Sequence, residues 1–437
     1  MIESILSVIF GLMLSCLSII LSKREGRFDL FAPPMIVTGI MWLQYFLPAF
    51  TLPYFNYWVY PHQWGENQVV LYPVLVSSIA WLAFLLGYRS KWGKTLSQSL
   101  PTPVSSCYTK WIAWALTIIG LNSLLIAVER SGGLLQIVQS GSIAKGTGIW
   151  MYLGFLTLYG IALLWSYEDK ISRIVAMLAS IIYFIILLSA QGRGAAITVF
   201  IVLLVMTRYL WNIHNITLIV IGSTFALFAI LFGSIGRFLT TVEALSSVIA
   251  IFIKIIENFI INTILTVNRD LSRLEQLSII LELIPKQHNY LLGVPILQSL
   301  FGPFKKYLFP DSVDWRIALT SIAIYGQVMD LSWGMGGTGV GEWYANFGLG
   351  GVVIGWILWG VGARCLYEWF QRSRQIHPAR ITVAVYVLLL NVFWGCISES
   401  TLHISSLWWL LPVIVTIRWK KDSFRGRLSY YLKSEHR

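Results

Sequence analysis

In residues 244–267 the chain reads ALSSVIAIFIKIIENFIINTILTV, and this stretch decides how the rest is threaded through a membrane. It is long and apolar enough to span a bilayer. If it spanned alone, every later loop would change sides and the arginines between residues 364 and 380 would lie outside, against the rule that basic loops stay in the cytoplasm. Lys254 and Glu257 can pair on one helical face. We therefore expect a helix that lies in the membrane interface or re-enters within protein.

The composition on both sides of this stretch indicates a polytopic membrane protein. Hydrophobic residues make up 57% of the 437 residues, charged residues only 12%, and the mean hydropathy is +0.70. Such values are far from those of soluble domains. We expect an all-α bundle of eleven membrane helices, at residues 2–22, 33–53, 69–88, 111–128, 149–167, 174–190, 195–210, 216–235, 342–363, 381–398 and 404–419.

The basic residues predict the orientation of this bundle. The net charge of +12 comes from short clusters between apolar runs, which argues against a nucleic-acid surface. With eleven spans and the N-terminus outside, these clusters share the cytoplasmic side together with the C-terminus. The clusters are Lys23, Arg24 and Arg27; Arg89, Lys91, Lys94 and Lys110; Lys170 and Arg173; Arg208; the arginines of 364–380; and the tail 418–437.

Three regions follow from this topology. Residues 1–235 hold the first eight spans, residues 236–341 form a large helical loop on the outside, and residues 342–437 hold the last three spans and a basic cytoplasmic tail. The loop is too polar to cross a bilayer and too long for an ordinary connection, so we look for function there. It contains no cysteine, which leaves it no disulfide or thiolate metal site.

Arg193 stands out because it lies between two glycines in a tight outward hairpin, LLSAQGRGAAITV. The glycines permit close backbone approach by a ligand, and a guanidinium at a helix start can bind a phosphate together with free backbone N–H groups. The alternative is an arginine that extends to the lipid headgroups. We predict an anion-binding arginine.

The outer loop supplies further candidate arginines. Arg269 and Arg273, in NRDLSRLEQL, are four residues apart, which on a helix places both guanidinium groups on one face, as a diphosphate requires. The alternative is a solvated helix with ion pairs among Asp270, Arg273 and Glu275. Two more candidates for anion binding are Arg237, directly after the eighth span, and Arg316.

The run GMGGTGVGEWYANFGLGG, residues 334–351, leads into the ninth span. It does not match a nucleotide-binding loop, because no strand precedes it and no Lys-Ser or Lys-Thr closes it. Glu342 is its only acid and is a candidate general base; a carboxylate that stabilises the helix dipole is the alternative. Tyr344, with Trp343 and Phe347, forms either an interfacial belt or a stacking surface for sugar rings.

His288 is the second candidate base. In LIPKQHNYLLGVP it lies in a turn between two apolar runs, where it is either an acceptor-activating base or an ordinary loop histidine. No HExxH motif, carboxylate cluster or nucleophile elbow is present, so we expect no metal site, no cofactor and no serine hydrolase.

Taken together, the arginine hairpin, residues 268–284, the run HNYLLGVPILQSLFGPFKKYLFPD and the run GTGVGEWYANFGLGG resemble the Wzy-type polymerases of O-antigen and oligosaccharide repeat units. The resemblance extends from about residue 180 to about 365, and the first half of the chain is similar in topology only. Membrane glycosyltransferases of the metal-dependent kind resemble one another in an acidic pair in the first external loop. Here that loop, residues 54–68, has Glu66 as its only acid.

The resemblance implies a metal-independent, inverting glycosyl transfer at the outer face of the bacterial cytoplasmic membrane. Donor and acceptor would both be undecaprenyl-diphosphate-linked glycans held among membrane lipids, and a chain-length regulator protein would be a further partner. The guanidinium groups would stabilise the departing diphosphate, and Glu342 or His288 would take the acceptor proton.

Two other functions fit the same features. A flippase for lipid-linked oligosaccharides also needs many spans and cationic residues, but its binding residues usually lie at mid-bilayer, whereas here the spans are nearly free of charge. A ligase that transfers finished glycan to another acceptor would share the fold and the reaction.

Overall fold

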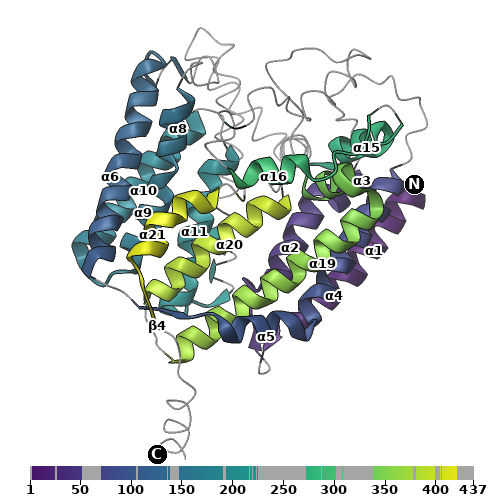
Figure 1. Ribbon diagram of the computed structural model, residues 1–437, viewed down its shortest axis with the longest axis horizontal. Coiled ribbons are helices and arrows are strands. Elements are labelled where there is room, and N and C mark those ends of the chain that lie inside the picture. The colour runs from purple at the N-terminus through teal and green to yellow at the C-terminus, as the bar shows by residue number, and fades with distance from the viewer. Residues whose placement is uncertain are drawn as a thin grey trace, which may run out of the picture.

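The computed structural model shows a helical membrane bundle (Figure 1). The structure describes residues 2–24, 27–51, 70–104, 107–134, 136–137, 147–189, 193–215, 217–218, 220–222, 224, 272–286, 288–301, 308, 338–376, 380–398, 404 and 406–420. Among these residues, seven helices are long and apolar enough to cross a membrane by length and composition. An all-α membrane bundle is therefore confirmed.

Most predicted spans coincide with helices that have similar limits. These helices are α1 (Ile2–Leu21), α4 (Leu71–Arg89), α6 (Cys107–Arg130), α8 (Gly148–Gly154) with α9 (Leu156–Ser166), α10 (Lys170–Ser189), α11 (Arg193–Trp211), α19 (Gly339–Ile376), α20 (Arg380–Ser398) and α21 (Leu407–Thr416). The predicted eighth span, 216–235, lies mostly outside the described residues, although residues 217–218, 220–222 and 224 are helical, and the interfacial helix at 244–267 lies entirely outside them. The total of eleven spans stays a prediction.

The predicted second span is a composite helix. It consists of α2 (Pro33–Met41), a π-helical turn η1 (Trp42–Phe46) and α3 (Leu47–Thr51). A π-turn bonds residue i+5 where an α-helix bonds i+4, and such turns are frequent at functional sites. Here the N–H of Leu47 donates to the carbonyl of Trp42.

The basic clusters meet at one end of the bundle, the lower end in Figure 1. Lys110 pairs with Asp169 at 3.0 Å, and Arg380 pairs with Glu168 at 3.2 Å. The backbone N–H of Ser172 and the Lys110 ammonium together hold the pKa of Asp169 low, at about 2. The same end carries α5 (Lys91–Ser99), the strand pair β1 (Lys23–Arg24) with β2 (Arg27–Phe28), and the pair β3 (Thr102–Val104) with β4 (Arg418–Lys420).

The described part of the outer loop lies at the opposite end, close to the N-terminus (Figure 1). It contains α15 (Leu274–Leu283) and α16 (Val294–Leu300), so the expectation of helices in this loop is confirmed for these residues. The indole N–H of Trp408, at the start of α21, donates to the carbonyl of Leu300 at 2.9 Å. The outer loop is thus fastened to the last described span.

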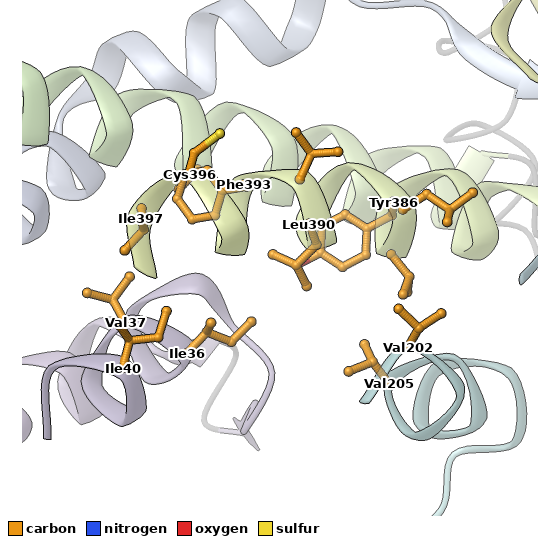
Figure 2. Close-up of a cluster of buried hydrophobic side chains, with 14 of the residues drawn as sticks. Ile36, Val37, Ile40, Val202, Val205, Tyr386, Leu390, Phe393, Cys396 and Ile397 are labelled. Carbon is orange, nitrogen blue, oxygen red and sulfur yellow. The ribbon is translucent and has the colours of Figure 1, made fainter. Parts of the chain in front are cut away.

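Helix α20 is the centre of the core. It is apolar on all sides, as expected of a helix surrounded by others. Figure 2 shows Ile397 of α20 facing Val37 of α2, while Val202 and Val205 of α11 lie on the same side of α20 nearer its Tyr386 end. Helices from the beginning, middle and end of the chain therefore share one hydrophobic core.

Two glycines allow α4 and α19 to cross at backbone contact. A Cβ added at Gly87 would lie 2.2 Å from the carbonyl oxygen of Ile357, and one added at Gly360 would lie 2.1 Å from that of Phe84. Small residues at helix crossings are how membrane helices gain van der Waals packing in the absence of a hydrophobic driving force between them.

Helix α19 is broken, which the predicted continuous span at 342–363 did not anticipate. Phe347 (φ −143°, ψ 15°) and Gly348 (φ 65°, ψ −158°) leave the helical conformation, and only glycine adopts the latter easily. A Cβ at Gly355 would lie 2.2 Å from the Trp343 ring, so the segment before the break folds back against the segment after it. Glu342 belongs to the short first segment and not to the spanning one.

The break exposes carbonyls that the outer loop then uses. The N–H of Leu291 donates to the carbonyl of Ala345 at 3.0 Å, and that of Leu292 to the carbonyl of Asn346 at 3.2 Å. The Asn346 side chain accepts from the N–H of Gly293 at 2.8 Å. The loop between α15 and α16 is therefore docked onto α19 by backbone hydrogen bonds.

We predict that Gly360→Ala destabilises the protein by about 1–3 kcal/mol, because the added methyl group overpacks the crossing with α4. The matched control is Gly362→Ala, where an added Cβ meets no atom within 4 Å. Thermal unfolding of the two purified variants in detergent measures the difference. Equal stability of both would show that the crossing is looser than described.

Candidate functional site

Four segments meet at the end of the bundle opposite the basic clusters. They are η1, the residues just before α15, the first turn of α19 and the end of α20. We call Gln44, Tyr45, Arg273, Thr338 and Glu342 the Glu342 cluster. It joins residues from the beginning, middle and end of the chain.

Thr338 holds the first turn of α19 in place. The N–H of Glu342 donates to the carbonyl of Thr338 at 2.9 Å, and the N–H of Gly341 approaches the Thr338 hydroxyl at 3.4 Å. A threonine at this position satisfies helix N–H groups that would otherwise have no acceptor. A hydrogen bond joins the same hydroxyl to that of Tyr45. The start of α19 is thus attached to η1.

Glu342 is fully buried, with 0% of its surface exposed. The glycines beside it allow this burial: a Cβ at Gly339 would lie 2.0 Å from the carbonyl oxygen of Ile397, and one at Gly341 would lie 2.6 Å from Cδ1 of Ile280. These two glycines therefore serve close packing against α20 and α15. A buried carboxylate is unfavourable unless it is compensated, so its presence here needs a reason.

Arg273 reaches the cluster through its backbone. Its N–H donates to the carbonyl of Gln44 at 2.9 Å. The residue has φ −122° and ψ 8° and precedes the helix that begins at Leu274, so the expected helical pair of Arg269 with Arg273 is wrong at Arg273. The alternative of a solvated helix is also wrong for α15, because Glu275 is only 8% exposed and most of the helix is buried.

Opposite charges act within the cluster. Arg273 lies near Tyr45 of η1, and Glu342 lies near Cys396 of α20. Such a pair of groups offers a cation that can stabilise an anion and a carboxylate that can accept a proton.

Tyr344 does not lie on an open stacking surface. It is 7% exposed and lies near Tyr72 and Tyr290. The expectation that Tyr344 stacks on a sugar ring is therefore not supported by its burial. Phe347 is 46% exposed and lies against Trp343, with ring centroids 6.3 Å apart, so the alternatives of belt and stacking surface remain for these two.

His288 lies in a turn between α15 and α16, as predicted. Its backbone N–H donates to the carbonyl of Leu283 at 3.1 Å, and its ring Nδ1 is 2.9 Å from the carbonyl oxygen of Asn289. The side chain is half-exposed. Neither of these hydrogen bonds leads to the Glu342 cluster.

The other predicted arginines cannot be placed in the cluster. Arg193 is the first residue of α11, in agreement with the predicted helix start, but its side chain lies outside the described part of the structure. Arg237, Arg269 and Arg316 lie outside the described residues altogether. Their anion-binding role stays a prediction.

Sequence reasoning missed Gln44, Tyr45 and Thr338. Gln44 is 8% exposed, its Nε2 donates to the carbonyl of Ser398 at 3.0 Å, and its Oε1 has no hydrogen-bond partner among the described residues. A polar side chain inside an apolar span is a sign of function. The amide of Gln44, within residues 33–53, was such a sign.

Within the described ranges, no group of three His, Cys, Asp or Glu side chains is arranged to hold a metal ion. Comparisons of the chain with protein-family models, with curated proteins and with solved structures find no match. The case for a function therefore depends on the chemistry of the residues themselves.

We predict that Tyr45→Phe lowers the free energy of unfolding by about 1 kcal/mol, the net worth of a typical hydrogen bond. Thr338→Val should cost at least as much, because it also removes the hydroxyl near the N–H of Gly341. The double variant should be no less stable than Thr338→Val alone, since the shared hydrogen bond is lost only once. Thermal unfolding of the four proteins tests this, and fully additive losses would show that the two hydroxyls act independently.

Proposed function

We propose that the chain is a polysaccharide polymerase that joins undecaprenyl-diphosphate-linked oligosaccharide repeat units by metal-independent, inverting glycosyl transfer. The observation that carries the proposal is the Glu342 cluster: Gln44 of η1 accepts the backbone N–H of Arg273, and the next residue, Tyr45, bonds to Thr338, whose carbonyl accepts the N–H of Glu342. The resemblance to Wzy-type polymerases supports it through the residues around Arg193, Arg273, His288 and Glu342.

Arg273 is proposed to act on the leaving group. As the bond between the anomeric carbon and the diphosphate oxygen breaks, its electron pair moves to that oxygen and negative charge develops there. A fixed guanidinium stabilises this charge more in the transition state than in the ground state. Arg193, Arg237, Arg269 and Arg316 are proposed to bind the same diphosphate or that of the acceptor.

Glu342 is proposed to act on the acceptor. A sugar hydroxyl of the second lipid-linked unit attacks the anomeric carbon from the face opposite the diphosphate, which inverts the configuration. Its proton passes to the carboxylate of Glu342, with His288 as the second candidate base. The products are a lengthened glycan on one lipid and undecaprenyl diphosphate.

The proposed place of this reaction is the outer face of the bacterial cytoplasmic membrane. The Glu342 cluster and the described outer-loop helices lie at the end of the bundle remote from the basic clusters, and basic clusters favour the cytoplasm. At that end the polyprenyl tails stay in the bilayer while the glycans meet above it.

Reconstitution tests the proposal directly. Purified protein in liposomes, given synthetic undecaprenyl-diphosphate-linked repeat units and EDTA, should yield a ladder of polymer lengths. We expect Arg273→Ala to lower the rate by about a hundredfold or more, since it removes a charge that stabilises the leaving group. Glu342→Gln should lower it by at least about a hundredfold. Lys286→Ala is the control, because Lys286 is an exposed cation of the same loop.

Each other outcome identifies a different function. Flipping of labelled lipid without glycosidic bond formation would mark a flippase, and transfer to a non-repeat acceptor without a ladder would mark a ligase. Full activity of Glu342→Gln would leave only the helix-dipole role for this carboxylate, and loss in His288→Ala alone would make His288 the base.

The orientation is testable by cysteine labelling in intact cells. With the native cysteines replaced, a cysteine at Asn289 should react with a membrane-impermeant maleimide, because this exposed residue lies in the outer loop. A cysteine at Lys94, exposed in α5 at the basic end, should react only after the cells are permeabilised. The reverse pattern would invert the proposed topology.

A further inference from the structure

A proline explains why the Gln44 carbonyl is available to Arg273. Where the π-turn returns to α-helix, the N–H of residue 48 would be within reach of two carbonyls, that of residue 43 in π-helical spacing and that of residue 44 in α-helical spacing. Residue 48 is Pro48, which has no N–H to donate. The carbonyl of Gln44 accepts the backbone N–H of Arg273 at 2.9 Å instead. The sequence of the second span thus creates an acceptor for a residue of the outer loop.

The turn around Gln44 is itself anchored. The Gln44 side chain donates to the carbonyl of Ser398 at the end of α20, 3.0 Å away. The next residue, Tyr45, bonds to Thr338 at the start of the helical segment that carries Glu342. Two consecutive residues of η1 therefore fix the backbone of Arg273 and the helix start of Glu342.

We infer that Pro48 is a positioning residue: by withholding an N–H from the Gln44 carbonyl, it reserves that carbonyl for Arg273 and so fixes the Arg273 backbone beside the turn that is bonded to the helix start of Glu342. The catalytic consequence rests on the proposed glycosyl transfer. The anchoring of the Arg273 backbone is independent of the proposed glycosyl transfer. The polymer assay tests the first and a labelling experiment tests the second.

Pro48→Ala supplies the missing N–H and allows the helix to close on the Gln44 carbonyl. Removal of a proline from within a helix should leave thermal stability unchanged or raise it. Turnover should nevertheless fall by about tenfold with little change in KM, because the misplaced guanidinium acts mainly on the transition state. Turnover would thus fall while thermal stability is unchanged or raised, whereas a purely structural role predicts that both fall together.

Pro412→Ala is the matched control, because Pro412 also lies inside an apolar helix, α21, outside the Glu342 cluster. It should retain wild-type turnover. Pro48→Val repeats the test with a side chain of nearly the volume of proline, which covers a loss of packing at this buried position. Wild-type turnover in both Pro48 variants would overturn the positioning role.

The anchoring is measured without reference to activity. In protein that lacks the native cysteines, Arg273→Cys is combined with Pro48→Ala or with Pro412→Ala, and the rate of reaction with a water-soluble thiosulfonate is recorded. Loss of one backbone hydrogen bond should speed labelling by up to about tenfold in the Pro48 background only. An unchanged rate would overturn the inference. A faster rate in the Pro48 background, combined with the absence of polymer from the wild-type protein, would support the anchoring and refute the proposed function.

Discussion

The structure depends on one constraint: inside a membrane, every backbone N–H and carbonyl needs a partner from the protein. Regular helices meet it by themselves. Two irregular places in the described spans, the π-turn with Pro48 and the break at Phe347 and Gly348, meet it with partners from the outer loop. Each irregularity therefore creates a docking point.

These docking points explain how a polar segment between two apolar hairpins becomes part of the bundle. The residues before α15 are attached to the second span through Gln44, and those before α16 are attached to α19 through Ala345 and Asn346. Between the two attachments, α15 buries its apolar side chains against α19 and α4. The charged residues of the Glu342 cluster lie where the chain departs from regular helix, as is common at sites of function.

Much of the fold was predictable because hydropathy is a strong signal in membrane helices. The span expected at 381–398 is the helix Arg380–Ser398, and the span expected at 2–22 is Ile2–Leu21. The break in α19 was not predicted, because a glycine-rich run is compatible with both close packing and a turn. The residues around it do both: Gly339 and Gly341 pack, and Gly348 turns.

The site was predictable only in part. Glu342 was predicted as the only acid of the glycine-rich run and Arg273 for its spacing from Arg269, and the structure gathers both into one cluster. The helical pairing of Arg273 failed because the helix starts one residue later, at Leu274, which spacing alone does not reveal. The amide of Gln44 was a signal within the apolar run at 33–53, but its partners and the role of Pro48 were not, since a hydrogen bond between residues so distant in sequence leaves no local pattern.

The docking of Leu291 and Leu292 onto α19 has a consequence for how large molecules enter. Moving the loop between α15 and α16 away from α19 would leave the carbonyls of Ala345 and Asn346 without their hydrogen-bond donors in surroundings poor in water. This would cost several kcal/mol for each carbonyl. This loop is therefore a fixed part of the helix bundle. Under the proposed function, the lipid-linked substrates then enter from the side, between helices in the plane of the bilayer, and not past this loop from above.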